Sequence, residues 1–201
     1  MELWQSDVCA AWRAALRNYT KVIRDQGVNG LAELDAWYRE ELPDLIAKRS
    51  PAHITHDELE RVVRWKMKRG VWRARNRSLV AGNDPIDVKE TTIQAFEAVP
   101  DVRKPITIIA RLAGVGPATA SAVLAVYRPD LFPFFDELVA AQIPNLGKLA
   151  FTESYYARYA TALRERAHAL AQNCRGRGLN AHETGQALWA HSGGKTKSPP
   201  T

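Results

Sequence analysis

The sequence has few cysteines: only Cys9 and Cys174 occur among its 201 residues, and no Cys-x-x-Cys motif is present. A four-cysteine iron–sulfur cluster and a cysteine-rich zinc site need more cysteine ligands than this. Both kinds of metal centre are therefore excluded within the chain. So few cysteines are typical of a reducing compartment, and we expect an intracellular protein, nuclear in a eukaryote and otherwise cytoplasmic. A single disulfide between the two stays open.

The sequence also lacks long apolar runs and period-two alternation. No run reaches the ~18 apolar residues that are needed to cross a bilayer. Residues 1–19 have no basic segment followed by an apolar one, as a secretory signal would. We therefore expect no membrane partner. No stretch alternates between apolar and polar residues as a half-buried strand does, so we expect no strands.

Apolar residues recur instead at spacings of three and four, the pattern of amphipathic helices. Thr55 and Glu58 match a capping box at the start of one helix, and the proline-containing segment 41–53 is expected to be a connection. We predict an all-α domain over 1–191, followed by a flexible Gly-, Ser-, Pro- and Lys-rich tail over 192–201. Gly70 is expected to end or bend the helix that starts at 55, and a helix resumes after it to about 81. The other expected helices cover 3–26, 31–41, 86–98, 105–112, 117–127, 136–142, 152–172 and 180–190.

The chain is basic, with a formal net charge of +6 and a pI of about 9.5. A basic protein favours acidic partners, and nucleic acid is the first of these to consider. A basic enzyme without a polyanionic partner is the alternative.

Residues 61–77 hold eight Lys or Arg residues and no acidic one. If the helix continues through Gly70, several of these side chains share one face with Trp72, which suits a phosphate backbone and an exposed base. A solvated charged face is the alternative. Trp65 and Trp72 either stack on a base in a pocket or belong in part to the core. We predict DNA contacts from Arg64, Lys66, Lys68, Arg69, Arg73 and Arg75.

The segment 105–127 predicts two helices joined by a tight turn. Gly114 and Gly116 flank Val115, and glycine is needed where φ is positive or where another backbone comes close. Pro117 suits the first position of the second helix. The free N–H groups there would lie at the positive end of that helix, where a phosphate oxygen can bind.

Two stretches resemble the helix–hairpin–helix DNA glycosylases of base-excision repair. "LAGVGPATASAVL" is similar to their hairpin, Leu-Pro-Gly-Val-Gly-x-x-Thr-Ala, but has Ala113 where proline is usual. "LFPFFDELV" is similar to the segment that carries their catalytic aspartate. The separation of Gly114 and Asp136 matches that in the adenine-specific mismatch glycosylases. The matching hairpin positions are Leu112, Gly114, Val115, Gly116, Thr119 and Ala120.

The resemblance implies a DNA-glycosylase-like, two-lobed helical domain without an iron–sulfur cluster, with the hairpin where the lobes meet. In this family the hairpin amides hold a phosphate of double-stranded DNA, often with a monovalent cation on the turn carbonyls. The damaged or mispaired base is flipped into a pocket between the lobes. No other cofactor and no metal is implied, and we expect a monomer. The corresponding DNA-contacting positions here are Gly114, Val115, Gly116, Ala118 and Thr119.

Asp136 corresponds to the catalytic aspartate, which stabilises the sugar cation as the N-glycosidic bond breaks or activates the attacking water. Bifunctional relatives carry a lysine nucleophile at the position of Ala118, so the resemblance implies a monofunctional glycosylase. Asp136 is also well placed as an N-cap, a role that is compatible with catalysis. The alternatives are a non-catalytic helix–hairpin–helix module that binds DNA or recruits a partner, and an RNA- or protein-binding scaffold.

Overall fold

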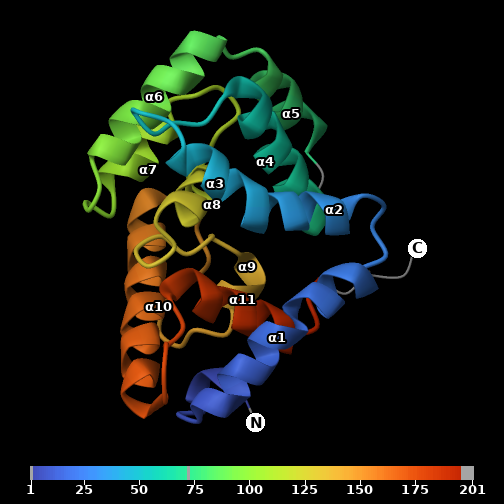
Figure 1. The fold of residues 1–201 in the computed structure, drawn as a ribbon, viewed down its shortest axis with the longest axis vertical. Helices are drawn as coiled ribbons and strands as arrows, with labels where there is room; N and C mark the ends of the chain where they lie inside the picture. Colours follow the sequence, from blue (N-terminus) through green and yellow to red (C-terminus); the bar gives the residue numbers. More distant parts are fainter. Residues whose placement is uncertain (1, 72, 196–201) are drawn as a thin grey trace.

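The computed structural model describes residues 2–71 and 73–195, and within them every regular element is helical (Figure 1). The predicted all-α class is therefore confirmed. The elements are η1 (Leu3–Gln5), α1 (Cys9–Asp25), α2 (Leu31–Ala36), η2 (Trp37–Glu41), α3 (Leu42–Ala47), α4 (His56–Arg69), α5 (Ala74–Ala81), α6 (Pro85–Glu97), α7 (Lys104–Ile109), α8 (Pro117–Tyr127), α9 (Glu137–Ala140), α10 (Glu153–Asn173) and α11 (Ala181–His191).

One continuous helical segment replaces the helix and the connection that were predicted for residues 31–53. α2, η2 and α3 follow one another without a break from Leu31 to Ala47. The predicted connection is therefore wrong over its first part. Pro43 does not stop the helix: it follows the π-helical segment η2 and lies in the first turn of α3, a position that proline tolerates.

α4 begins at the predicted capping box. The Thr55 hydroxyl accepts from the Glu58 N–H, and the Glu58 carboxylate accepts from the Thr55 N–H. The helix ends at Arg69, because Gly70 takes a non-helical conformation with φ −127° and ψ −122°. Gly70 therefore ends this helix, as expected, and the chain becomes helical again over Ala74–Ala81. The single basic face, which required the helix to run through Gly70, does not form. Trp72, which was assigned to that face, lies outside the described residues.

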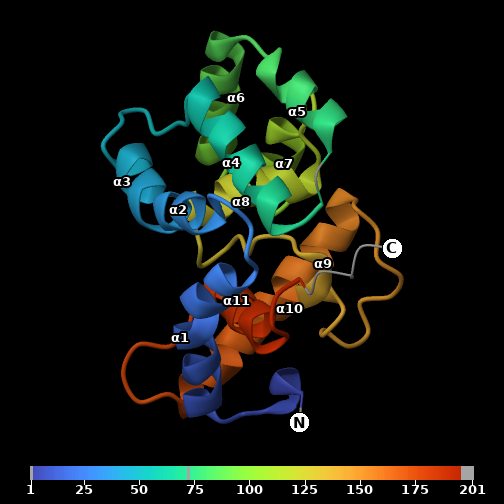
Figure 2. The ribbon, with the colours of Figure 1, turned by 90° about the vertical axis from the view of Figure 1, so that its right-hand side faces the viewer.

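The helices gather into two groups (Figures 1 and 2). α2 to α8 lie at one end of the molecule, and α1, α10 and α11 lie at the other. α8 lies at the base of the first group, and all its residues from Ala118 to Val126 are buried. The chain then passes from α8 towards α9, which contacts α11 in the second group. Residues 128–136 thus lead from one group to the other.

A disulfide joins Cys9 at the start of α1 to Cys174 at the end of α10, with a Cα–Cα distance of 5.4 Å. Disulfides persist mainly in oxidising compartments. The cysteine content therefore no longer supports the predicted reducing, intracellular compartment. No helix in the described part of the chain is long and apolar enough to span a membrane.

Four residues of the predicted flexible tail, 192–195, lie within the described chain, and Ser192, Gly193 and Gly194 are hydrogen-bonded to the rest. The Gly193 and Gly194 N–H groups donate to the Ala190 and Trp189 carbonyls, and the Gln26 amide donates to the Gly193 carbonyl at 3.1 Å. The rest of the tail, 196–201, lies outside the described residues.

Candidate functional site

A cavity of about 400 Å³ brings together the two features that the sequence analysis singled out. Its walls include the end of α4, the first residues of α8 and the segment that carries Asp136. The hairpin and the aspartate therefore face the same space, although 20 residues separate Gly116 from Asp136. The lining residues are Lys66, Arg69, Gly70, Val71, Arg73, Asn76, Gly116, Pro117, Ala118, Thr119, Phe134, Phe135, Asp136, Glu137, Leu138, Phe151, Trp189 and Lys195.

The turn between α7 and α8 packs closely against α5. Gly114 has a φ of +75°, and a Cβ there would lie 2.6 Å from the Asn76 carbonyl oxygen. Both reasons for a glycine that the sequence suggested therefore apply at this position. The Asn83 side chain holds the same turn, since its amide donates to the Ala113 carbonyl at 3.0 Å and its oxygen accepts from the Ala113 N–H at 2.8 Å.

Gly116 differs from Gly114 because its backbone is extended, with φ −108°, and open space surrounds the position of a Cβ. The Thr119 N–H donates to the Gly116 carbonyl, so it is not free as the sequence suggested. The Gly116 and Ala118 N–H groups have no hydrogen-bond partner among the described residues. Both residues line the cavity, as does Thr119, whereas Val115 is buried against the core. An anion at this end of the cavity would therefore meet two backbone donors.

The segment before Asp136 is held in place by side chains from three helices. The Ser121 hydroxyl on α8 accepts from the Phe135 N–H at 2.9 Å and donates to the Ala118 carbonyl at 3.0 Å. The Tyr159 hydroxyl on α10 donates to the Phe134 carbonyl at 2.7 Å. On α11, His182 Nδ1 accepts from the Phe134 N–H at 3.3 Å. These bonds fix the position of the aspartate backbone relative to the hairpin.

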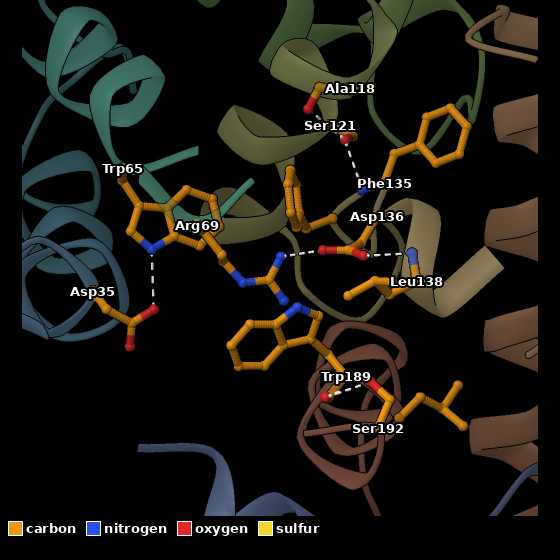
Figure 3. Close-up of polar contacts among 12 residues, drawn as sticks. Asp35, Trp65, Arg69, Ala118, Ser121, Phe135, Asp136, Leu138, Trp189 and Ser192 are labelled. Carbon is orange, nitrogen blue, oxygen red and sulfur yellow. Dashed lines mark hydrogen bonds and ion pairs between the residues drawn. The ribbon is translucent and has the colours of Figure 1, made fainter. Parts of the chain in front are cut away.

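Asp136 is the N-cap of α9, as one of its two expected roles required. One carboxylate oxygen accepts from the Leu138 N–H at 2.8 Å, and the other forms an ion pair with Arg69 (Figure 3). The side chains of Arg69 and Asp136 are 4% and 12% exposed, so water screens this pair weakly. Each carboxylate oxygen can accept two hydrogen bonds, which leaves acceptor capacity towards the cavity.

Arg69 lies inside the molecule and not on the surface, where a phosphate contact was expected. Its guanidinium lies 4.2 Å from the ring centroid of Trp189 and 5.0 Å from that of Phe134. The buried Nε has no hydrogen-bond partner among the described residues. The sequence prediction fails here because Arg69 is on the inner face of α4, where the neighbouring rings and Asp136 replace water around the charge.

The other predicted basic contacts lie in different surroundings. Lys66 is half-buried and lines the cavity, and Arg73 lines it from an exposed position. Arg64 is half-buried and Arg75 is exposed, and neither lines the cavity. Lys68 donates to the Asn29 carbonyl, away from the cavity. The predicted set therefore does not form one surface.

Trp65 belongs to the core, which was one of the two roles left open for it. It is 1% exposed, stacks on Tyr38 with ring centroids 3.7 Å apart, and donates to the Asp35 carboxylate at 3.0 Å. It does not line the cavity.

Several residues of the site carry no signal in the sequence. Trp189, Phe151 and Lys195 come from α11 and from loops far along the chain, and only the fold brings them to the cavity. The anchoring roles of Ser121 and Asn83 also depend on distant partners. Phe151 is 50% exposed and Val71 is 47% exposed, so the cavity mouth has apolar side chains open to solvent.

The described residues contain no group of three or more His, Cys, Asp or Glu that could hold a metal ion. At the turn, the Leu112 carbonyl accepts from the Val115 N–H and the Ala113 carbonyl accepts from Asn83. A monovalent cation on these carbonyls stays a prediction. No protein-family model, curated protein or solved structure matches this chain.

Proposed function

We propose that this protein is a monofunctional base-excision DNA glycosylase of the helix–hairpin–helix type. The observation that carries the proposal is the cavity that Asp136 shares with Gly116, Ala118 and Thr119 of the hairpin. A glycosylase needs a carboxylate within one nucleotide of the group that holds the DNA backbone, because the flipped base stays attached to that backbone. The helical groups at the two ends of the molecule would be the two lobes.

The charge of the cavity supports a nucleic-acid substrate. Four cationic side chains line it, those of Lys66, Arg69, Arg73 and Lys195, against the two carboxylates of Asp136 and Glu137. The Gly116 and Ala118 N–H groups add two donors at the start of α8. A phosphate near these donors and a base in the cavity would both be accommodated, since about 400 Å³ exceeds the volume of a nucleobase.

Asp136 would act on the sugar while its backbone and one oxygen stay fixed. The Leu138 N–H orients the carboxylate, and the free acceptor positions would face the C1′ atom as positive charge develops there. Such a carboxylate lowers the barrier only if it is oriented before the reaction, and the anchors on α8, α10 and α11 provide that orientation.

A non-catalytic DNA-binding module is the second candidate, and the Arg69–Asp136 ion pair favours it. A guanidinium beside the carboxylate neutralises the charge that would stabilise a sugar cation. In this alternative the Arg69–Asp136 pair has only a structural role in the cavity wall, and the N–H groups of the hairpin bind the DNA backbone.

The two candidates differ in their response to Asp136→Asn. Asparagine keeps the size and the N-cap of aspartate but removes the negative charge. Wild type, Asp136→Asn and the matched control Glu137→Gln would be incubated with duplexes that carry single damaged or mispaired bases, followed by hot alkali. Circular dichroism before the assay ensures that each variant is folded at the assay temperature.

A glycosylase gives alkali-dependent cleavage with wild type and Glu137→Gln and at least about a hundredfold less with Asp136→Asn, as expected for loss of charge stabilisation. Salt-dependent binding without cleavage by any of the three would identify the DNA-binding module. If wild type neither cleaves nor binds DNA at low salt, both candidates are wrong and an RNA- or protein-binding scaffold is left.

A further inference from the structure

Lys66 places a primary amine in the same cavity as Asp136. It lies three residues before Arg69 on α4, so the two side chains share one face of that helix. Both line the cavity. Arg69 forms an ion pair with Asp136 and contacts the surrounding aromatic rings. The Lys66 ammonium, in contrast, makes no hydrogen bond or ion pair within the described part of the chain.

The surroundings of Lys66 also favour a neutral amine. Burial of its side chain and the positive charge of Arg73 lower the pKa of Lys66, while the carboxylates of Asp136 and Glu137 oppose this change. The neutral amine is the nucleophilic form of lysine. The two other lysines near this site differ: Lys68 is bonded to the Asn29 carbonyl outside the cavity, and Lys195 lies near the end of the described chain.

We propose that Lys66 is a nucleophile that attacks the abasic sugar in this cavity and cleaves the DNA strand by β-elimination. The inference rests on the proposed function in one respect, that the cavity receives a nucleotide of bound DNA. It changes that function, because a lysine on α4 would supply the lyase activity that Ala118 in the hairpin does not. The protein would then process the product of base removal as well as produce it.

The reaction balances with water as the only co-reactant. The Lys66 Nζ electron pair attacks C1′ of the ring-opened sugar, and the aldehyde π electrons move to oxygen. The adduct takes up a proton and loses water to form a protonated imine. Loss of a C2′ proton to water then drives electrons towards C3′ and expels the 3′ phosphate as the C3′–O bond breaks. Water hydrolyses the remaining conjugated imine and regenerates the amine.

The test uses a duplex with one preformed abasic site, so it does not depend on base removal. Sodium cyanoborohydride reduces the imine and leaves a covalent protein–DNA adduct, which is measured on a denaturing gel. The full chain would be compared as wild type, Lys66→Ala, Lys66→Arg and Lys68→Ala. Lys66→Arg keeps the positive charge but has no neutral amine at neutral pH, so it separates nucleophilic attack from simple attraction.

We expect a trapped adduct with wild type and Lys68→Ala, and at least about a tenfold loss with both Lys66 variants. Peptide mapping of the wild-type adduct is expected to place the DNA on Lys66. Circular dichroism and binding to the abasic duplex ensure that the Lys66 variants are folded and engage the DNA. An adduct that persists in Lys66→Ala, or an absent adduct in wild type, overturns the inference.

The outcome is distinguishable from a failure of the proposed glycosylase. Trapping on abasic DNA without release of any base from intact duplexes would reject the glycosylase and keep the lyase. Release of a base from intact duplexes without a trapped adduct would keep the glycosylase and reject the lyase. If wild type neither binds the abasic duplex nor releases a base from intact duplexes, both proposals are wrong.

Discussion

Arg69 on α4 and the arginines of the segment 73–77 lie in opposite environments. On α4, Arg69 is buried beside Asp136, and the Arg61 guanidinium lies 4.1 Å from the ring centroid of Trp37. In the segment 73–77 the arginine side chains are exposed. The charge of Arg69 therefore helps to build the wall of the cavity. The arginines of the second segment, of which Arg73 also lines the cavity, are exposed to solvent, where a polyanion can approach them. Local charge density alone does not distinguish these two uses.

The largest expected effect is the loss of stability on removal of the buried charge. Arg69→Met leaves the Asp136 carboxylate unpaired at 12% exposure, and we expect the free energy of unfolding to fall by about 3–5 kcal/mol. The matched change Arg75→Met, on an exposed residue, is expected to cost no more than about 0.5 kcal/mol. Urea denaturation of both variants measures the difference. Equal stability of the two variants would show that the two regions do not differ as described.

The next effect concerns how α5 is fixed against the hairpin. Gly114→Ala forces a side chain into a positive φ and against the Asn76 carbonyl, and we expect a loss of about 2 kcal/mol or more. Gly116→Ala serves as the control, since open space surrounds its Cβ and its φ is ordinary. Thermal unfolding would rank the two variants. If Gly114→Ala lowered the stability only slightly, the contact between the hairpin and α5 would not hold the arginines of α5 in place.

His182 is expected to make the free energy of unfolding depend on pH, with a loss of about 2 kcal/mol at acidic pH. It lies near the charge of Arg69 on α4. Burial, with help from Arg69 and Arg39, lowers the pKa of His182 to about 3. The unfolded chain takes up a proton near pH 6.5 that the folded chain does not. The contribution of His182 to the free energy of unfolding is therefore fully present above about pH 6.5. Below that pH it falls by about 1.4 kcal/mol per pH unit, so that about 2 kcal/mol is lost at pH 5.

Urea denaturation between pH 5 and 8 would measure that slope, with His182→Gln as the variant that should lack it. Arg75→Met should leave the slope unchanged, because burial is the main cause of the low pKa of His182 and Arg75 is not among the charges that lower it. Identical slopes in wild type and His182→Gln would exclude the histidine as the cause.

The smallest effect is expected when single exposed arginines are replaced, and it concerns the salt dependence of DNA binding. Replacement of Arg73 or Arg75 by Ala should leave the fold intact and reduce the slope of log K against log salt by about 0.9 for each phosphate that the variant no longer neutralises. Fluorescence anisotropy with a labelled duplex at several salt concentrations measures this. An unchanged slope for both variants would place the DNA-contacting surface elsewhere on the molecule.

Much of the local structure could be predicted because its causes lie within a few residues. The Thr55–Glu58 capping box, the hairpin of α7 and α8 and the N-cap at Asp136 were all visible as short patterns. The continuation of α2 into α3 was not, because Pro43 usually marks a break and only its place in a first turn removes that penalty. At Gly70 the sequence predicted an end or a bend of the helix and could not choose between them, because glycine is tolerated inside a helix as well as after one.

The candidate site could be predicted only in part, for a related reason. The hairpin and Asp136 could be identified because each belongs to a continuous stretch of sequence. The pairing of Arg69 with Asp136 joins residues 67 positions apart, and Trp189 reaches the same guanidinium from α11. Arg69 lies seven residues after Val62, so the helical period places it on the inner face of α4, but no local pattern shows that Asp136 and Trp189 meet it there.

The sequence by itself determined that the chain is helical, where most helices begin and end, and which turn requires a glycine, because hydrophobic period, capping and φ preferences act over one or two turns. The tertiary structure decided what each charge faces: whether a cation meets water, an aromatic ring or a carboxylate. It also decided that Cys9 meets Cys174 across 165 residues. Electrostatic energies depend on burial and on partners distant in the chain, so they arise only when the helices pack.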